Sequence, residues 1–260
     1  MPIAKVNGIN IAYDVNGQGE PLVLIMGFAA GKSLWMHQTG FFKKNYRVIT
    51  FDNRGVGKSD KPEGPYSIRM MADDTVHLIN HLGIDKAHIL GASMGGMIAQ
   101  ELAINYPQKV MKLVLQSTFA CQDNALNGET PEWTEAIGLL FQRKVNPMVS
   151  LMFNRRFNKV IFIPLMKIQA ELMRSSERKG IFAQREAILR HHDVDRLPLI
   201  TAPTLVIVGT EDRVIKTSSS EVMAKLIPNT KLVKVEGGSH TFGFEMSGRF
   251  NKEVLDFLTA

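Results

Sequence analysis

The stretch Gly91-Ala92-Ser93-Met94-Gly95 decides the fold, because it joins two segments of opposite character. The short apolar run before it indicates a buried strand, and residues Met94–Tyr106 after it are rich in Ala, Ile and Leu at helical spacing. A serine in a sharp turn between strand and helix needs neighbours without side chains, and the two glycines supply them. The pattern predicts a strand–turn–helix unit that presents the Ser93 hydroxyl. A glycine-rich turn without chemistry is the alternative.

Short apolar runs alternate with helix-period segments on both sides of this unit. The runs lack polar–apolar alternation, as strands buried on both faces should. They are Pro21–Met26, Arg47–Phe51, His88–Leu90, Lys112–Leu115, Thr204–Val208 and Lys231–Val235. The other expected helices are Ile68–His81, Lys216–Leu226 and Met246–Leu258. Asn7-Gly8 favours a tight hairpin near the N-terminus. The order predicts an α/β protein with a mostly parallel sheet flanked by helices.

Residues 119–197 interrupt the alternation. They contain no convincing strand, and their many Phe and Met residues suggest several short amphipathic helices inserted between two strands. We therefore expect a core formed by residues 1–118 and 198–260, with a helical insertion over 119–197.

The composition excludes several classes of protein. Of the 260 residues, 45% are hydrophobic and 22% charged, which excludes disordered and collagen-like chains. The net charge is +6, but basic residues are scattered among acidic ones without interleaved aromatics, so we expect no nucleic-acid partner. No apolar run approaches the roughly 20 residues that span a bilayer, so we expect no membrane partner.

Two further features concern location and metals. The single cysteine, Cys121, cannot form an internal disulfide, and the first residues lack a secretory pattern, so we expect a cytoplasmic protein. His77 and His81 have zinc-ligand spacing on one expected helix, but no third ligand is evident. We therefore expect no metal site.

The serine needs a base to take its proton. His240 follows the last expected strand, and Asp212 follows the strand before it. Because ligand sites of α/β sheets lie at the carboxyl ends of the strands, we expect both to meet Ser93 at one edge. The sequence therefore predicts Ser93 as nucleophile, His240 as general base and Asp212 as the acid that orients it. Glu211 is the rival acid, and a helix-capping role for Asp212 is the other alternative.

A negative oxygen that forms during attack on a carbonyl also needs stabilisation. We expect one donor to be the backbone N–H of Met94, which follows the nucleophile. The second is expected to be the N–H of Phe28, in the loop after the first apolar strand. Gly27 would let this backbone approach Ser93 closely, unless it is an ordinary loop glycine.

Several motifs together resemble those of the α/β-hydrolase superfamily, in the same order and over essentially the whole chain. They are Phe51-Asp52-Asn53-Arg54-Gly55-Val56-Gly57-Lys58-Ser59, Ser93-Met94-Gly95-Gly96, Asn105-Tyr106-Pro107 with Leu113-Val114-Leu115, Gly209-Thr210-Glu211-Asp212 and Gly237-Gly238-Ser239-His240. The resemblance implies an α/β-hydrolase fold with about eight strands, a cap over residues 119–197 and a Ser93–Asp212–His240 triad that needs no cofactor. Methionine at position 26 departs from the histidine usual in the family, which supports the oxyanion loop. Arg54 is expected to hold its own loop.

The resemblance points first to a hydrolase of carboxylic esters or lactones that forms an acyl-enzyme on Ser93. The Met- and Phe-rich insertion suggests an adaptable pocket for small to medium, largely apolar substrates. Serine at the elbow argues against haloalkane dehalogenases and epoxide hydrolases, which carry aspartate there.

Two alternatives stay open. Residues Ser93–Gln100 are similar to enol-lactone hydrolases and to carbon–carbon bond hydrolases of aromatic degradation, whose carboxylate-bearing substrates could bind Arg155, Arg156 or Arg185. The other alternative is a small-molecule receptor that keeps the triad but turns over slowly. A homodimer is compatible with either.

Overall fold

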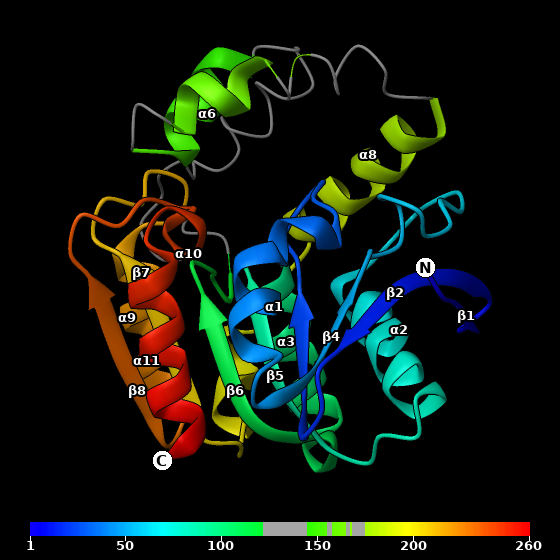
Figure 1. Ribbon diagram of the computed structural model, residues 1–260, viewed down its shortest axis with the longest axis horizontal. Coiled ribbons are helices and arrows are strands. Elements are labelled where there is room, and N and C mark those ends of the chain that lie inside the picture. The colour runs from blue at the N-terminus through cyan, green and yellow to red at the C-terminus, as the bar shows by residue number, and fades with distance from the viewer. Residues whose placement is uncertain (122–144, 155–157, 165–166, 168–174) are drawn as a thin grey trace.

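An eight-stranded sheet runs through the protein, seen here in a computed structural model that describes residues 1–121, 145–154, 158–164, 167 and 175–260 (Figure 1). The strand order is β1-β2-β4-β3-β5-β6-β7-β8. The strands are β1 (Ile3–Val6), β2 (Ile9–Asn16), β3 (Glu20–Ile25), β4 (Tyr46–Phe51), β5 (Ala87–Ala92), β6 (Val110–Gln116), β7 (Thr204–Gly209) and β8 (Thr230–Val235). The β1–β2 and β2–β4 pairs are antiparallel and all others are parallel. The predicted mostly parallel sheet of about eight strands is confirmed.

Helices cover both faces of this sheet (Figure 1). The longer ones are α1 (Met36–Phe42), α2 (Ile68–His81), α3 (Met94–Asn105), α6 (Val145–Met152), α8 (Ser175–Leu189), α9 (Thr217–Leu226) and α11 (Ser247–Thr259). The short ones are η1 (Lys32–Trp35), η2 (Pro107–Lys109), η3 (Val194–Leu199) and α10 (Phe242–Glu245). The C-terminal helix differs from its predicted start at Met246, because that residue has φ −124° and separates α10 from α11.

Among the described residues, the two largest apolar clusters form the core on opposite faces of the sheet. Alternate residues of β3 divide between them: Val23 and Ile25 belong to the cluster that includes residues of α2, α3 and α9, whereas Leu22 and Leu24 belong to the cluster that includes residues of α1 and α11. This division follows from the two-residue period of a strand. It also explains why the strand sequence is apolar throughout, since neither face is left to water.

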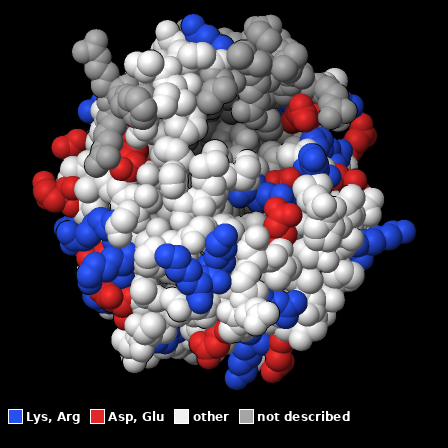
Figure 2. All heavy atoms as spheres, viewed as in Figure 1, with Lys and Arg blue, Asp and Glu red and all other residues white. Residues whose placement is uncertain are grey.

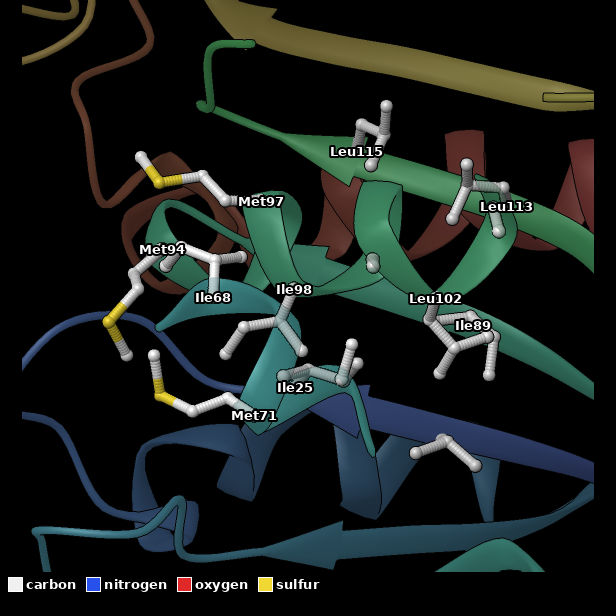
Figure 3. Packing of buried hydrophobic residues seen from close by; sticks show 14 of the residues in the cluster. Ile25, Ile68, Met71, Ile89, Met94, Met97, Ile98, Leu102, Leu113 and Leu115 are labelled. Carbon is white, nitrogen blue, oxygen red and sulfur yellow. The ribbon is translucent and has the colours of Figure 1, made fainter. Parts of the chain in front are cut away.

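The helix after the Ser93 turn lies deep in the first cluster. Figure 3 shows Ile98 and Leu102 of α3 close to Ile25 and Ile89 of the central strands. The helix is buried at nearly every position, which agrees with its apolar character on all sides. Packing of this kind fixes the first turn of α3, and therefore Ser93, against the sheet.

Local signals set the ends of α2 and of the first hairpin. The side chain of Ser67 accepts a hydrogen bond from Met70 N at the start of α2, and Gly83 follows its end with φ +67°. Asn7 and Gly8 have φ values of 47° and 77°, as a two-residue hairpin turn requires. The predicted hairpin turn and the predicted helix Ile68–His81 are therefore confirmed.

The described residues of the predicted insertion include α6 and α8, which lie beyond the carboxyl ends of the strands (Figure 1). Residues 122–144, 155–157, 165–166 and 168–174 lie outside the described residues, so the predicted division into core and cap stays a prediction. Figure 2 shows basic and acidic side chains intermingled over the face in view. No described helix is long and apolar enough to cross a membrane.

Candidate active site

Ser93 occupies a strained turn at the carboxyl end of β5. Its backbone has φ 55° and ψ −123°, a conformation that side-chain-bearing residues rarely adopt. A Cβ atom on Gly91 would lie 2.2 Å from the carbonyl oxygen of Gly95, and one on Gly95 would lie 2.1 Å from that of Ile25. Both glycines are therefore required by close backbone contact. The turn is held by Ser93 N, which donates to Gln116 O at 2.9 Å.

Asp212 and His240 lie together in neighbouring loops. Nδ1 of His240 is 2.9 Å from Oδ2 and 3.2 Å from Oδ1 of Asp212. The N–H groups of Val214 and Ile215 both donate to Oδ1 at 2.9 Å. Burial by itself would raise the pKa of Asp212, but the charge and hydrogen bond of His240 and the two backbone donors outweigh it and lower this pKa. Asp212 is thus held as a carboxylate against the imidazole ring.

The rival acid lies elsewhere. Glu211 is exposed, and its carboxylate accepts a hydrogen bond from Asn154 Nδ2 at 2.8 Å. Burial and the contact with His240 therefore distinguish Asp212 from its neighbour. Asp212 does not cap α9, whose N-cap residue is Lys216.

Ser93 and His240 line one cavity of about 720 Å³ at the carboxyl edge of the sheet. The order β5-β6-β7-β8 brings together loops that are far apart in the sequence. In the described part of the chain, no hydrogen bond yet joins the His240 ring to the Ser93 hydroxyl. Such bonds are often long before substrate arrives. The arrangement places a hydroxyl and a carboxylate-bound imidazole in one cavity.

The two predicted oxyanion donors flank the serine. Within the described residues, neither Phe28 N nor Met94 N donates to a protein acceptor, so both N–H groups are free for a ligand. A Cβ on Gly27 would lie 3.1 Å from that of Ser93, which shows how closely this loop passes the hydroxyl. Where the family has histidine, the Met26 carbonyl accepts a hydrogen bond from the buried Asn53 Nδ2 at 2.8 Å.

The rest of the cavity is largely apolar. Among the described residues, its apolar lining comes from Met26, Phe28, Trp35, Met97, Phe119, Met148, Met152, Phe153, Phe162, Ile181, Ile188, Val214, Ile215 and Phe244. Of the predicted carboxylate-binding arginines, Arg185 pairs with Glu186 at 2.6 Å and does not line the cavity, while Arg155 and Arg156 lie outside the described residues. The described lining is therefore mainly apolar, with Lys32, Asp52 and Lys58 as its charged members.

Other predicted residues have structural positions. The Arg54 guanidinium binds Asp74 through two hydrogen bonds of 2.5 Å, which holds its loop as the sequence predicted. His77 and His81 are exposed on α2. No group of three or more His, Cys, Asp or Glu side chains is placed to bind a metal in the ranges that the structure describes.

Two buried polar residues near the site had no signal in the sequence. Gln184 of α8 bonds to the backbone of Ala29, 155 residues away. Glu245 of α10 receives hydrogen bonds from Ser239 Oγ and, across 91 residues, from Asn154 N. Neither belongs to a motif, and contacts of such range leave no local spacing to recognise.

The fold and this set of residues match a known family. Residues 20–246 match the family described as the alpha/beta hydrolase fold. The chain therefore belongs to the α/β-hydrolase family, and it is a hydrolase. It is 27% identical to a putative carbamate hydrolase, RutD, of Azorhizobium caulinodans, covering 99% of this chain and 98% of that one. It is 28% identical to 3-oxoadipate enol-lactonase 2 of Acinetobacter baylyi, covering 95% and 92%.

A solved structure agrees with these matches. The enol-lactonase from Burkholderia xenovorans LB400 superimposes with a TM-score of 0.87 at 25% identity, and the match covers all of both chains. The likeness thus extends from the first strand to the last helix.

Proposed function

We propose that the protein hydrolyses carboxylic esters or lactones of small to medium, largely apolar substrates, through an acyl-enzyme on Ser93. The observation that carries the proposal is the buried Asp212–His240 pair, which lines the same apolar cavity as a serine held at positive φ. Names of relatives support the lactone part, since two of them are enol-lactonases.

Each group has one role in the proposed reaction. His240 takes the proton of the Ser93 hydroxyl as its oxygen attacks the substrate carbonyl. The N–H groups of Phe28 and Met94 hold the negative oxygen of the tetrahedral intermediate. His240 then protonates the leaving alcohol, and the acyl group stays on Ser93. Water, deprotonated by the same ring, attacks the acyl-enzyme and releases the acid.

Asp212 acts through His240 in this mechanism. It binds Nδ1, so that the other ring nitrogen is available to the serine, and its charge stabilises the protonated ring. The serine, histidine and aspartate supply nucleophile, base and orienting acid, so the reaction needs no cofactor. The single free cysteine, which is buried, leads us to propose a cytoplasmic location.

The test is hydrolysis of p-nitrophenyl esters from acetate to decanoate by the wild-type protein and by Ser93→Ala. The triad proteases that lose their nucleophile lose on the order of a millionfold in kcat. We expect Ser93-dependent turnover that peaks at one chain length and so measures the acyl subsite. Ser220→Ala is the control, because Ser220 is a buried serine of α9 that does not line the cavity.

Two results would overturn the proposal. Turnover that survives Ser93→Ala would assign the reaction to another group. A folded wild-type protein that hydrolyses neither the ester series nor simple aliphatic lactones would favour carbon–carbon hydrolysis or a receptor function instead.

A further inference from the structure

We propose that Gln184 of α8 is a positioning residue that holds the oxyanion loop, residues 26–29, in its working conformation. The inference deepens the proposed function and rests on it. It assigns to a residue of the predicted cap a part in transition-state stabilisation, which the cap sequence does not suggest.

The amide of Gln184 is fully buried and uses both of its ends. Oε1 accepts a hydrogen bond from Ala29 N at 3.0 Å, and Nε2 donates to Arg54 O at 2.7 Å. One side chain thus joins three segments that are distant in the sequence. A buried amide that satisfies two backbone groups is costly to lose, because each group is left without water or a partner.

The oxyanion loop needs external support because its backbone is strained. Ala29 has φ 55°, an unfavourable value for a residue with a Cβ atom. The peptide that Gln184 fixes directly follows Phe28, whose N–H is the proposed donor. At the other end of the loop, Asn53 Nδ2 holds the carbonyl of Met26 at 2.8 Å. Two buried amides therefore restrain the loop from both sides, in a chain that lacks the family histidine.

The helix that carries Gln184 is itself firmly placed. A Cβ on Gly180 would lie 2.4 Å from the carbonyl oxygen of Gly55, so the backbones of α8 and the Arg54 loop are in direct contact. Gly180 and Gln184 are four residues apart and share one face of the helix. The Arg54 loop is fixed in turn by the two hydrogen bonds to Asp74. Gln184 thus connects Ala29 to a loop that is itself held by the buried Arg54–Asp74 ion pair.

This geometry predicts a specific kinetic signature. The oxyanion donors bind the negative oxygen, which exists only in the transition state and intermediate, so their misplacement lowers kcat more than it raises KM. Losing one donor outright costs about a hundred- to a thousandfold in kcat. A donor that is displaced but not lost should lower kcat by a smaller factor.

The experiment compares Gln184→Met and Gln184→Glu with wild type, on the best ester of the series. The methionine fills the space without hydrogen bonds, and we expect kcat to fall about ten- to a hundredfold with KM changed less than about twofold. The glutamate keeps an oxygen that accepts from Ala29 N, and burial should raise the pKa of its carboxyl group so that it retains a proton to donate to Arg54 O. Its kcat should therefore lie between that of the methionine variant and that of wild type. Hydrogen exchange at the Ala29 amide should accelerate in the methionine variant, whether or not a substrate is known.

Gln100→Met is the matched control. Gln100 is also a fully buried glutamine, but its hydrogen bond goes to the carbonyl of Phe119. This variant should lose stability yet keep kcat and Ala29 exchange near wild type. Unchanged Ala29 exchange in Gln184→Met, or a kcat loss equal to that of Gln100→Met, would overturn the inference. Absent Ser93-dependent turnover in wild type would instead overturn the proposed function.

Discussion

Nδ1 of His240 lies 2.9 Å from Oδ2 of Asp212, while the other oxygen of that carboxylate accepts two backbone N–H groups. The two oxygens therefore have separate tasks: Oδ1 holds the loop, and Oδ2 binds the ring more closely. This separation makes it possible to change the chemistry of the pair while keeping the loop.

Asp212→Asn should abolish most of the activity but leave the fold intact. An asparagine oxygen at the Oδ1 position still accepts from Val214 N and Ile215 N, whereas its NH₂ group now points a donor at His240 Nδ1. The ring is forced into the tautomer that cannot accept the serine proton, which costs roughly ten-thousandfold in kcat in a serine protease. Ester kinetics and thermal unfolding measure the two effects. A kcat within tenfold of wild type would remove Asp212 from the mechanism.

Gly95→Ala should prevent correct folding. Its Cβ would lie 2.1 Å from the carbonyl oxygen of Ile25, a contact with backbone that cannot move aside. We expect insoluble protein or a loss of more than about 4 kcal/mol in the free energy of unfolding. The matched control is Gly40→Ala, in α1, where no atom lies within 4 Å of the added Cβ. That variant should gain about 0.5–1 kcal/mol in urea unfolding. Equal stability of the two variants would contradict the packing argument.

Glu245→Gln should lower kcat by loosening the loop that carries His240. Glu245 Oε2 accepts from Ser239 Oγ, next to His240, and from Asn154 N at 3.2 Å, while Oε1 accepts from Asn158 Nδ2 at 3.0 Å. A glutamine side chain has one oxygen in place of two, so it can accept either the hydrogen bonds made by Oε2 or the one made by Oε1, but not both. Since small displacements of catalytic groups cost up to about a hundredfold, we expect a kcat loss of roughly ten- to a hundredfold.

The control for Glu245→Gln is the same substitution at Glu253, which pairs with Arg249 on α11. It should leave kcat unchanged. Steady-state kinetics of both variants, with circular dichroism to confirm folding, give the comparison. If the two variants behave alike, Glu245 does not position the histidine loop.

Asp193→Asn should change how stability depends on pH. Burial, and then Glu101, raise the pKa of Asp193 to about 6 in the folded protein, above its ordinary value. The stabilising contribution of its protonation is therefore present at low pH and lost as pH rises through about 6. Asparagine does not ionise, so the variant does not lose this stability as the pH rises. Relative to wild type, the variant should therefore gain stability as pH rises from 4 to 7, by up to about 3 kcal/mol, a figure that already includes the Arg196 ion pair because this pair contributes to the pKa of about 6.

Urea unfolding at pH 4, 5, 6 and 7 measures this difference. His191 shifts stability in the opposite sense, because burial lowers its pKa to about 3 and the folded state cannot take up the proton that the unfolded state binds below about pH 6.5. Because Nδ1 of His191 lies 3.8 Å from Oδ2 of Asp193, the two titrations are coupled, and the difference between the two proteins also contains any change in the pKa of His191. Parallel curves for the two proteins would show that Asp193 is ionised throughout the range.

Much of the fold followed from local patterns. The apolar runs gave the sheet strands to within two residues, because a strand buried on both faces needs apolar side chains at every position. The helix predicted over Ile68–His81 has these bounds in the structure, where the Ser67 side chain caps its start and Gly83 follows its end with φ +67°. The last helix begins one residue later than predicted, because Met246, with φ −124°, separates α10 from α11.

The sequence by itself determined the sheet, the strained turn at Ser93 and the positions of Asp212 and His240 at strand ends, because these depend on short-range periodicity and on the rule that parallel strands share one carboxyl edge. The family resemblance already favoured Asp212 over Glu211, and the tertiary structure places Asp212 against His240 and Glu211 against Asn154. Only the tertiary structure revealed Gln184 and Glu245 beside the site. The reason is physical. A hydrogen bond across 155 residues is specified by the packing of α8 on the Arg54 loop, and no spacing along the chain records it.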